Sequence, residues 1–263
     1  LYVAILFRLA SRLTERATTS NPTWTKLAGD QVELEFGDLE AALHAEAEQV
    51  LSLNAKRKPP DYDLNRHVCI IGNSQHLPVR SSAIDTVLTS PPYCTRIDYA
   101  VATARELAVL GLGERSGFAA LRSALMGTTT VPRKAVPTHR YWGRTCTGFL
   151  DALRKHESKA SATYYFKNHV QYFDALFRSL AEIQRVLKPN GFAAVVVQDS
   201  YYKDLHNDLP KMIIEMCEGI GLPLCEQASF PVRNSMAALN KGSKRYRVDR
   251  PLVETVLCFY KPD

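Results

Sequence analysis

The stretch Asp85-Thr86-Val87-Leu88-Thr89-Ser90-Pro91-Pro92-Tyr93 decides how this chain folds. It begins inside a short apolar run rich in β-branched residues, Ile84 to Leu88, which predicts a buried strand. Two consecutive prolines cannot continue a β-ladder, because neither has an N–H to donate and both fix φ at about −65°. We expect the strand to end at Ser90 in a stiff, extended elbow that holds Ser90 and Tyr93 in fixed places. The carboxyl end of a strand is where open α/β sheets carry their chemistry.

Residues Thr89 to Tyr93 resemble motif IV of the amino-methylating DNA methyltransferases, in which Asp, Asn or Ser precedes Pro-Pro-Tyr. The Ser form is commonest in the enzymes that make N4-methylcytosine. The resemblance implies that Ser90, Pro91, Pro92 and Tyr93 are catalytic, that S-adenosylmethionine is the cofactor, and that double-stranded DNA is the substrate. The alternative interpretation is a proline-stiffened loop that follows a core strand.

The exocyclic amine of cytosine is a poor nucleophile, because its lone pair is delocalised into the ring. In an enzyme of this kind, the Ser90 hydroxyl and the Pro91 carbonyl would accept the amine hydrogens and aim the nitrogen at the methyl group. Tyr93 would stack on a base that has left the duplex. Arg96 and Asp98 either pin the elbow or contact phosphate and base, and the sequence leaves both roles open.

The composition limits the classes of protein that the chain can belong to. Its 263 residues, 46% of them hydrophobic, suffice for one large domain or for one domain with an insertion. A net charge of +6 is compatible with a nucleic-acid partner without proving one. No apolar run approaches the ~20 residues of a membrane span, so we expect no membrane partner and a cytoplasmic location.

The six cysteines are scattered, with no Cys-x-x-Cys pair and no neighbouring His cluster. We therefore expect buried free thiols in a reducing compartment and no metal site. Methylation at carbon 5 of cytosine would need a Cys nucleophile within Pro-Cys. Cys94 instead follows Tyr93, and we interpret it as structural.

The first 64 residues predict two amphipathic helices and a connector. Apolar residues recur at helical spacing over residues 1–15 and 39–53. In the second helix, Leu43, Ala47, Val50 and Leu51 fall on the face that we expect to be packed. We expect residues 1–64 to be a helical insertion and connector, and residues 65–263 to be a catalytic methyltransferase domain.

His67 to Ile71 predicts another strand, which ends in Gly72-Asn73-Ser74. In the resembling family, the loop after this strand passes the adenine of S-adenosylmethionine, and Asn73 is the matching position. Asn73 and Ser90 are thus the candidate cofactor-binding residues. Gly-Asn-Ser is also an ordinary turn sequence, and this interpretation stays open.

After the elbow, residues 101–110 predict a helix, and a basic segment at about 114–168 follows it. Basic side chains neutralise phosphate, and aromatic side chains can stack on bases or prop them open. The interleaved aromatic residues are Tyr141, Trp142, Phe149, Tyr164 and Tyr165. The residues predicted to bind DNA are Arg133, Lys134, Arg140 and Arg144. The alternative is a solvated insertion with a small core of its own.

The rest of the chain resembles the end of the class I S-adenosylmethionine-dependent methyltransferases. Residues 172–186 predict a helix, Leu187-Lys188-Pro189-Asn190-Gly191 a turn in which Gly191 supplies a positive φ, and Phe192 to Val197 a buried strand. A helix at 210–220 and two strands at 222–232 and 252–260 follow. The predicted fold class is α/β, a Rossmann-like sheet with a terminal antiparallel strand pair, its first strands missing.

That fold needs a glycine-rich turn after its first strand, where backbone N–H groups meet the cofactor. Gly111-Leu112-Gly113 and Gly219-Ile220-Gly221 both follow predicted helices, so neither qualifies. We therefore expect an N-terminally truncated fragment, with the cofactor motif upstream of Leu1 and a complete C-terminus.

The predicted function is that of a site-specific DNA methyltransferase acting on the N4 amine of cytosine. The alternatives are an N6-adenine DNA methyltransferase, an RNA or protein amide methyltransferase, and a non-catalytic DNA-binding subunit of a modification system. A cognate restriction nuclease is a candidate partner. Target sequence and oligomeric state are not indicated.

Overall fold

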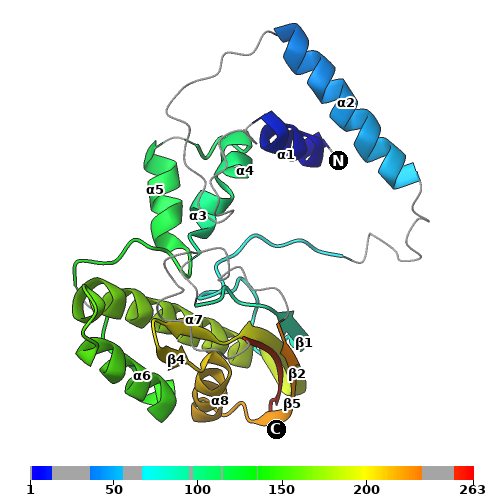
Figure 1. The fold of residues 1–263 in the computed structure, drawn as a ribbon. Coiled ribbons are helices and arrows are strands. Elements are labelled where there is room, and N and C mark those ends of the chain that lie inside the picture. The colour runs from blue at the N-terminus through cyan, green and yellow to red at the C-terminus, as the bar shows by residue number, and fades with distance from the viewer. Residues whose placement is uncertain are drawn as a thin grey trace. The chain divides into compact units, whose positions relative to one another are not determined.

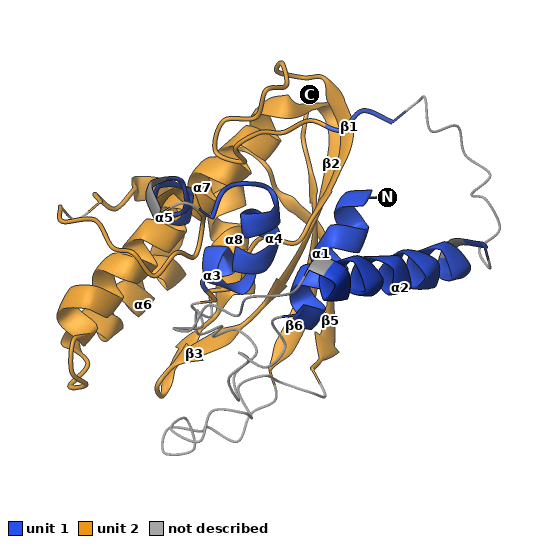
Figure 2. Cartoon of the chain, turned by 90° about the horizontal axis from the view of Figure 1, so that it is seen from above, with its two compact units in different colours: residues 1–69, 98–122 blue, residues 70–97, 123–263 orange. Residues whose placement is uncertain are grey.

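The computed structural model describes residues 2–13, 36–55, 67–94, 97–113, 115–134, 136–232 and 252–263. The chain divides into two compact units, of which the first comprises Leu1–Cys69 and Asp98–Arg122 (Figure 2). The second unit comprises Ile70–Ile97 and Ser123–Asp263. In the described parts of the chain, no helix is both long and apolar enough to cross a membrane.

The first unit is helical, as the periodicity of its sequence predicts. Its elements are α1 (Tyr2–Leu13), α2 (Phe36–Ala55), α3 (Tyr99–Ala102), α4 (Ala104–Val109) and most of α5 (Arg115–Ala124). Both predicted N-terminal helices are confirmed, and α1 packs against α2 and α4. The helix predicted at 101–110 is interrupted at Thr103, which separates α3 from α4.

The predicted packed face of α2 is wrong for its two leucines, whereas Ala47 and Val50 on that face are half-buried. Leu43 and Leu51 are exposed, and among the α2 residues whose burial is described, Glu46 is the fully buried one. The Glu46 carboxylate accepts hydrogen bonds from Arg8 at 2.9 Å and from Arg12 at 3.2 Å. These bonds hold the pKa of Glu46 below its usual range. An ionic contact between α1 and α2 therefore lies at the buried position of α2, where hydropathy predicts apolar packing.

The second unit contains a four-stranded mixed sheet. Its strands lie in the order β1 (Ile84–Thr89), β2 (Leu187–Gln198), β6 (Val253–Tyr260) and β5 (Leu224–Pro231). β1 and β2 are parallel, whereas β6 runs antiparallel to both β2 and β5. The predicted Rossmann-like α/β fold with a terminal antiparallel strand pair is confirmed.

Helices cover one side of this sheet (Figure 1). They are α6 (Gly143–Lys155), α7 (Phe166–Val186) and α8 (Leu209–Gly219), with short turns η3 (Arg140–Trp142) and η4 (Ser161–Tyr165) before α6 and α7. α7 and α8 pack against the strands, and α6 packs against both helices. Alternate residues of β2 and β6 are buried, as expected for strands with one covered face.

Two strand predictions need correction. Ile84 to Leu88 is a strand, but it is not buried: β1 lies at the edge of the described sheet, and Leu88 is 77% exposed. The strand predicted at His67 to Ile71 is absent, and Ile71 is 98% exposed. A strand exists only through a ladder with a neighbour. Among the described residues, β2 is the partner of β1, and no ladder reaches residues 67–71.

The predicted turn Leu187–Gly191 also differs from the prediction, because these residues form the first part of β2. The residue with positive φ is Asn190, at 62°, and Gly191 is not among those residues. Asn tolerates this left-handed conformation better than most residues. A Cβ on Gly191 would lie 2.8 Å from the Lys188 carbonyl oxygen and 3.0 Å from that of Asp85. Glycine is required here because two backbone segments approach it closely.

The basic segment contributes to the main core. Trp142 is fully buried, and Phe149 and Leu153 lie in the same cluster as the interior residues of α7, α8 and the sheet. The expectation that Trp142 and Phe149 stack on bases is therefore wrong. The alternative, a separate small core, does not describe these side chains either.

All six cysteines are free thiols, as predicted. Cys94, Cys146 and Cys217 are buried, whereas the prediction of burial is wrong for the exposed Cys69 and Cys225. The described residues contain no group of His, Cys, Asp and Glu side chains that could hold a metal ion.

Candidate active site

The elbow, Ser90–Tyr93, follows directly from the carboxyl end of β1. Because β1 and β2 are parallel, their carboxyl ends meet at the same edge of the sheet. Ser90 is exposed, and its hydroxyl has no hydrogen bond to any described residue, so it can accept or donate one to a ligand. Pro91, Pro92 and Tyr93 are half-buried.

Hydrogen bonds from three different elements hold the residues after Pro91. The Tyr172 hydroxyl on α7 donates to the Pro92 carbonyl oxygen at 2.6 Å. The Tyr93 hydroxyl donates to Glu254 Oε1 on β6 at 2.5 Å. The Ser200 hydroxyl donates to the Cys94 carbonyl oxygen at 3.1 Å. Three separate elements therefore fix the elbow and the residue after it. The sequence alone indicates only that the two prolines make this stretch stiff.

A short hairpin that no sequence pattern predicts supplies the third of these bonds. It consists of β3 (Ser200–Tyr202) and β4 (Leu205–Asn207), which pair antiparallel directly after β2. Asn207 Nδ2 donates to Ser200 Oγ at 3.0 Å, and both residues are buried. Two strands of three residues each are too short for a hydrophobic alternation, so periodicity offers no means of finding them.

Cys94 is the buried residue that completes the elbow. Burial raises the pKa of its thiol to about 12, so the side chain is a neutral thiol at physiological pH. This state agrees with the structural interpretation of Cys94 and is unfavourable for a nucleophile.

The start of β6, next to Glu254, is tied to the end of β2. Asp199 Oδ1 accepts from the Val253 N–H at 2.8 Å, and the Asp199 N–H donates to the Val253 carbonyl oxygen at 3.1 Å. The other carboxylate oxygen of Asp199 lies 2.8 Å from His206 Nε2 on the hairpin. β2, β6 and the hairpin thus form one hydrogen-bonded unit beside the elbow.

Asn73, the candidate adenine-binding residue, lies in a turn. Its side-chain oxygen accepts from the Gln75 N–H at 3.0 Å, and its carbonyl oxygen accepts from the His76 N–H at 2.9 Å. The turn interpretation of Gly-Asn-Ser therefore describes the backbone. It leaves the Asn73 amide nitrogen without a hydrogen bond among the described residues, so a ligand role is still open to it.

The chain after this turn is held by α7. The Leu77 N–H donates to Glu182 Oε2 at 2.7 Å, and Arg185 donates to the Leu77 carbonyl oxygen at 3.1 Å. Arg185 also binds Glu182 at 2.7 Å, and these bonds lower the pKa of Glu182 to about 2. An ion pair on α7 therefore fixes the segment that carries Asn73.

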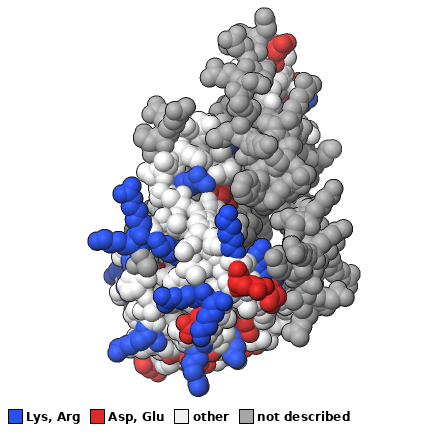
Figure 3. Space-filling view, turned by 60° about the vertical axis from the view of Figure 1, so that its left-hand side comes forward, with Lys and Arg blue, Asp and Glu red and all other residues white. Residues whose placement is uncertain are grey.

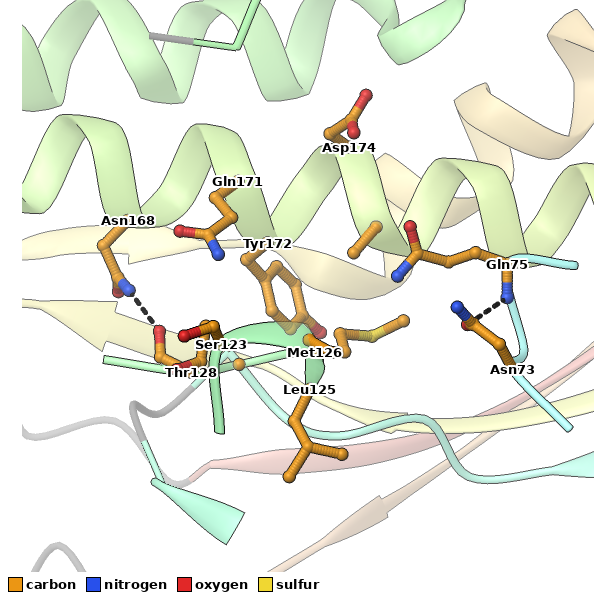
Figure 4. A pocket seen from close by; sticks show the side chains of 13 residues that line it. Asn73, Gln75, Ser123, Leu125, Met126, Thr128, Asn168, Gln171, Tyr172 and Asp174 are labelled. Carbon is orange, nitrogen blue, oxygen red and sulfur yellow. Dashed lines mark hydrogen bonds between the residues drawn. The ribbon is translucent and has the colours of Figure 1, made fainter. Parts of the chain in front are cut away.

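Asn73 also lines a cavity of about 300 Å³, seen in Figure 4. Its walls come from the turn, from residues 123–128 and from α7. Gln171 contributes a side-chain oxygen that is buried without a partner among the described residues. Tyr172 forms part of the wall and binds the Pro92 carbonyl, so α7 connects this cavity with the elbow.

Asp98 and Arg96 are the two residues to which the sequence assigned alternative roles. Asp98 is buried in the first unit, where it accepts from the Val101 N–H at 3.3 Å as the N-cap of α3 and from Arg122 Nε at 2.7 Å. These contacts are those of a helix cap and an ion pair. Arg96 lies outside the described residues.

The four predicted DNA-binding residues are all exposed. Arg133 and Lys134 precede η3, Arg140 begins it, and Arg144 lies in the first turn of α6. None of them forms an ion pair with a described acidic residue. Arg140 instead lies over the Tyr141 ring, 4.5 Å from its centroid. Lys and Arg side chains are spread widely over the face in Figure 3, with fewer acidic ones among them.

The described residues fit the expected cofactor only in part. Asn73 and Ser90, the two candidate cofactor-binding residues, each have a polar side-chain atom without a partner among the described residues. The glycine pairs do not fit: Gly111 follows α4, and Gly219 and Gly221 lie at the end of α8. None of the described strands ends in a glycine-rich turn, so the backbone cradle for the cofactor is not among these residues.

Comparison with known proteins places the chain in a family. Residues 84–263, from the first residue of β1 onward, match the DNA methylase (N6_N4_Mtase) family model. This is more than half of the chain, and the chain belongs to this DNA methylase family. The family model covers both N6 and N4 methylases, so the resemblance found in the sequence is confirmed at the level of the family.

Two curated relatives are the Type II methyltransferases M.AvaI of Nostoc sp. (strain PCC 7120 / SAG 25.82 / UTEX 2576) and of Anabaena variabilis. Each is 29% identical over 175 residues, a match that covers 60% of this chain and 35% of the relative. The chain thus spans about a third of the length of the curated relatives that it matches.

Among solved structures, a protein of Thermus thermophilus, provisionally described as a DNA modification methylase, is similar to the chain. Its complex with S-adenosyl-L-methionine has a TM-score of 0.39 at 15% identity, covering 73% of this chain and 54% of that protein. A second crystal structure gives a TM-score of 0.37 at 16% identity, with 73% and 53% covered. Similarity at this level carries no functional argument.

Proposed function

We propose that the chain carries the methyl-transfer site of a DNA methyltransferase that modifies the N4 amine of cytosine. The observation that supports this most directly is the elbow, which lies at the carboxyl edge of a parallel strand pair with Ser90 exposed. The three residues after Pro91 are held by hydrogen bonds from α7, β6 and β3. A rigid support under an exposed polar group is what transition-state positioning requires.

The chemistry follows from these groups. The nitrogen lone pair forms a bond to the methyl carbon, the carbon–sulfur bond breaks, and the nitrogen loses a proton to solvent. Bound S-adenosylmethionine supplies an electrophilic methyl group on a sulfonium. Ser90 and the Pro91 carbonyl oxygen accept the two amine hydrogens, which localises the lone pair and aims it. Tyr93 stacks on the extruded base.

The choice of cytosine over adenine rests on residue 90. A serine hydroxyl is short and uncharged, and it suits a pocket that closes on a small pyrimidine. The Asp or Asn usual in adenine enzymes has a longer reach. The Ser-Pro-Pro-Tyr form is also the commonest one among enzymes that make N4-methylcytosine.

The proposal extends to the rest of the chain. Residues 65–263 are the catalytic domain and residues 1–64 a helical insertion and connector. Arg133, Lys134, Arg140 and Arg144 in the segment 114–168 contact DNA phosphates, because their charges are exposed and unpaired among the described acids. The cofactor is S-adenosylmethionine, the location is the cytoplasm, and a cognate restriction nuclease is a candidate partner, as for a Type II modification enzyme.

Nucleoside mass spectrometry tests the proposal. DNA from cells that express the complete gene product should contain N4-methylcytosine, and DNA from cells that express its Ser90→Ala variant should contain much less. N6-methyladenine without N4-methylcytosine would overturn the choice of base but not the class of reaction. DNA without either base, from cells with well-folded protein, would overturn the proposed function.

Calorimetry tests the cofactor assignment. We expect the 263-residue chain alone to bind S-adenosylmethionine weakly or not at all, because none of its described strands ends in a glycine-rich turn. The complete gene product should bind it. Micromolar binding by the isolated chain would show that its own residues supply the cofactor site without a glycine-rich turn.

A further inference from the structure

We propose that Glu254 is a positioning residue for methyl transfer, which acts by holding the Tyr93 hydroxyl and so fixing the ring that receives the target base. This inference rests on the proposed function and adds a residue that lies 161 positions from Tyr93 in the sequence. It assigns a functional role to the start of β6.

The contact itself is short and directional. The Tyr93 hydroxyl and Glu254 Oε1 are 2.5 Å apart, in the range of charge-assisted O–H···O⁻ hydrogen bonds. Both side chains are half-buried, so solvent competes less for the bond than at an open surface. Such bonds are roughly twice as strong as neutral ones.

The Glu254 backbone is one of the best-fixed positions beside the elbow. In the ladder it pairs with Gln198 of β2 on one side and with Phe230 of β5 on the other. Its neighbour Val253 exchanges hydrogen bonds with both the side chain and the backbone of Asp199. The carboxylate therefore projects from a rigid support, which is what a positioning group needs.

The other two anchors cannot replace this one. Tyr172 and Ser200 bind the carbonyl oxygens of Pro92 and Cys94, so they fix the backbone on either side of Tyr93. A fixed backbone does not by itself set the side-chain torsions of Tyr93. A bond at the hydroxyl holds the far end of the ring and thereby sets the tilt of its plane. A stacked base takes its orientation from that plane, and its amine is then aimed with it.

A double-mutant cycle tests the inference in the complete gene product. Glu254→Ala and Tyr93→Phe each remove the same bond, so each should lower kcat by on the order of 10-fold while the KM for S-adenosylmethionine stays unchanged. The double variant should be no slower than either single variant. Glu254→Gln, whose amide oxygen can still accept the hydroxyl proton, should restore most of the activity.

A second measurement reports on the base without requiring turnover. A duplex with 2-aminopurine at the target position fluoresces when the base leaves the stack, and stacking on Tyr93 should quench it. Glu254→Ala and Tyr93→Phe should change this signal equally. The matched control is Glu226→Ala, on exposed strand β5 of the same sheet, which should change neither kcat nor fluorescence.

If the kcat losses of the two single variants multiply in the double variant, the inference is overturned. It is also overturned if Glu254→Ala has the same kcat and fluorescence as Glu226→Ala. If Glu254→Ala does not fold, Glu254→Asp carries the same test, because its shorter side chain moves the carboxylate away from the hydroxyl. Failure of the proposed function is distinguishable, because the wild-type protein would then methylate no base at all.

Discussion

The stretch Pro92–Cys94 and the basic residues between Arg133 and Arg144 are held in opposite ways. Each residue of the first is fixed by a hydrogen bond from a different element, α7, β6 or β3. The basic side chains are exposed and have no ion pair with a described acid. A chemical step needs fixed geometry, whereas phosphate neutralisation needs only charge within reach. Substitutions in the two regions should therefore affect different measured quantities.

The largest effect is expected for Tyr93→Ala. Loss of a stacking ring forfeits about 1–3 kcal/mol, and misplacement of the amine can cost on the order of 100-fold. We expect kcat of the complete gene product to fall by at least about 100-fold, with the affinity for S-adenosylmethionine nearly unchanged. Radiometric methyl transfer and calorimetry measure the two quantities.

Tyr2→Ala is the matched control for this variant, since Tyr2 is an exposed tyrosine of α1. It should leave kcat unchanged. If Tyr93→Ala instead raised the KM for DNA with kcat intact, the elbow would serve binding and the contrast between the two regions would disappear.

A smaller effect, and a different one, is expected from the basic residues. Changing Arg133, Lys134, Arg140 and Arg144 to Gln should weaken DNA binding and reduce its salt dependence by up to about 3.6 in the slope of log K against log salt, or about 0.9 per phosphate contact. The value of kcat at saturating DNA should not change. Binding titrations over a range of salt concentrations measure the slope.

Replacing Arg133, Arg140 and Arg144 by Lys provides the control, because it retains the charge. This variant should keep the wild-type slope. An unchanged slope in the Gln variant would show that these side chains form an ordinary solvated surface.

The smallest effect is expected for the substitution of Glu182. The Glu182 carboxylate binds Arg185 and the Leu77 N–H, and it thereby holds the segment that contains Leu77 against α7. Its folded-state pKa of about 2 lies below the ordinary value, so its contribution is present at neutral pH and is lost as the pH falls toward 2. Glu182→Gln should cost on the order of 1 kcal/mol of stability at pH 7 and little near pH 2. Thermal unfolding across this range measures the difference.

Glu218→Gln is the control for this prediction, because it changes an exposed glutamate on α8. It should leave the acid limb of the stability curve unchanged. Parallel curves for wild type and Glu182→Gln between pH 2 and pH 5 would contradict the assigned role of the Glu182–Arg185 pair.

The features predicted correctly from sequence are those that a few neighbouring residues impose. Pro91 and Pro92 end β1 because they have no N–H to donate, whatever surrounds them. Helical periodicity identifies α7 and α8 because each carries a continuous apolar face. The family resemblance rests on the same elbow, and the family match confirms that the chain belongs to that DNA methylase family.

The wrong predictions concern which partner a segment meets. Residues 67–71 have the composition of a strand but no ladder, and β1 is exposed because it lies at the edge of the described sheet. Trp142 has the sequence surroundings of a surface aromatic residue and is fully buried. Composition limits the structures that a segment can adopt. The neighbours that pack against the segment determine which of these structures it adopts.

By itself, the sequence determined the elbow, its stiffness and the chemistry that its residues can perform, because those properties are covalent or local. Only the tertiary structure decided that Glu254 meets Tyr93, that Tyr172 meets Pro92, and that an unpredicted hairpin supports Cys94. These pairs are 161, 80 and 106 residues apart. No local pattern encodes such contacts, because they arise only when the sheet and its helices bring distant segments to one edge.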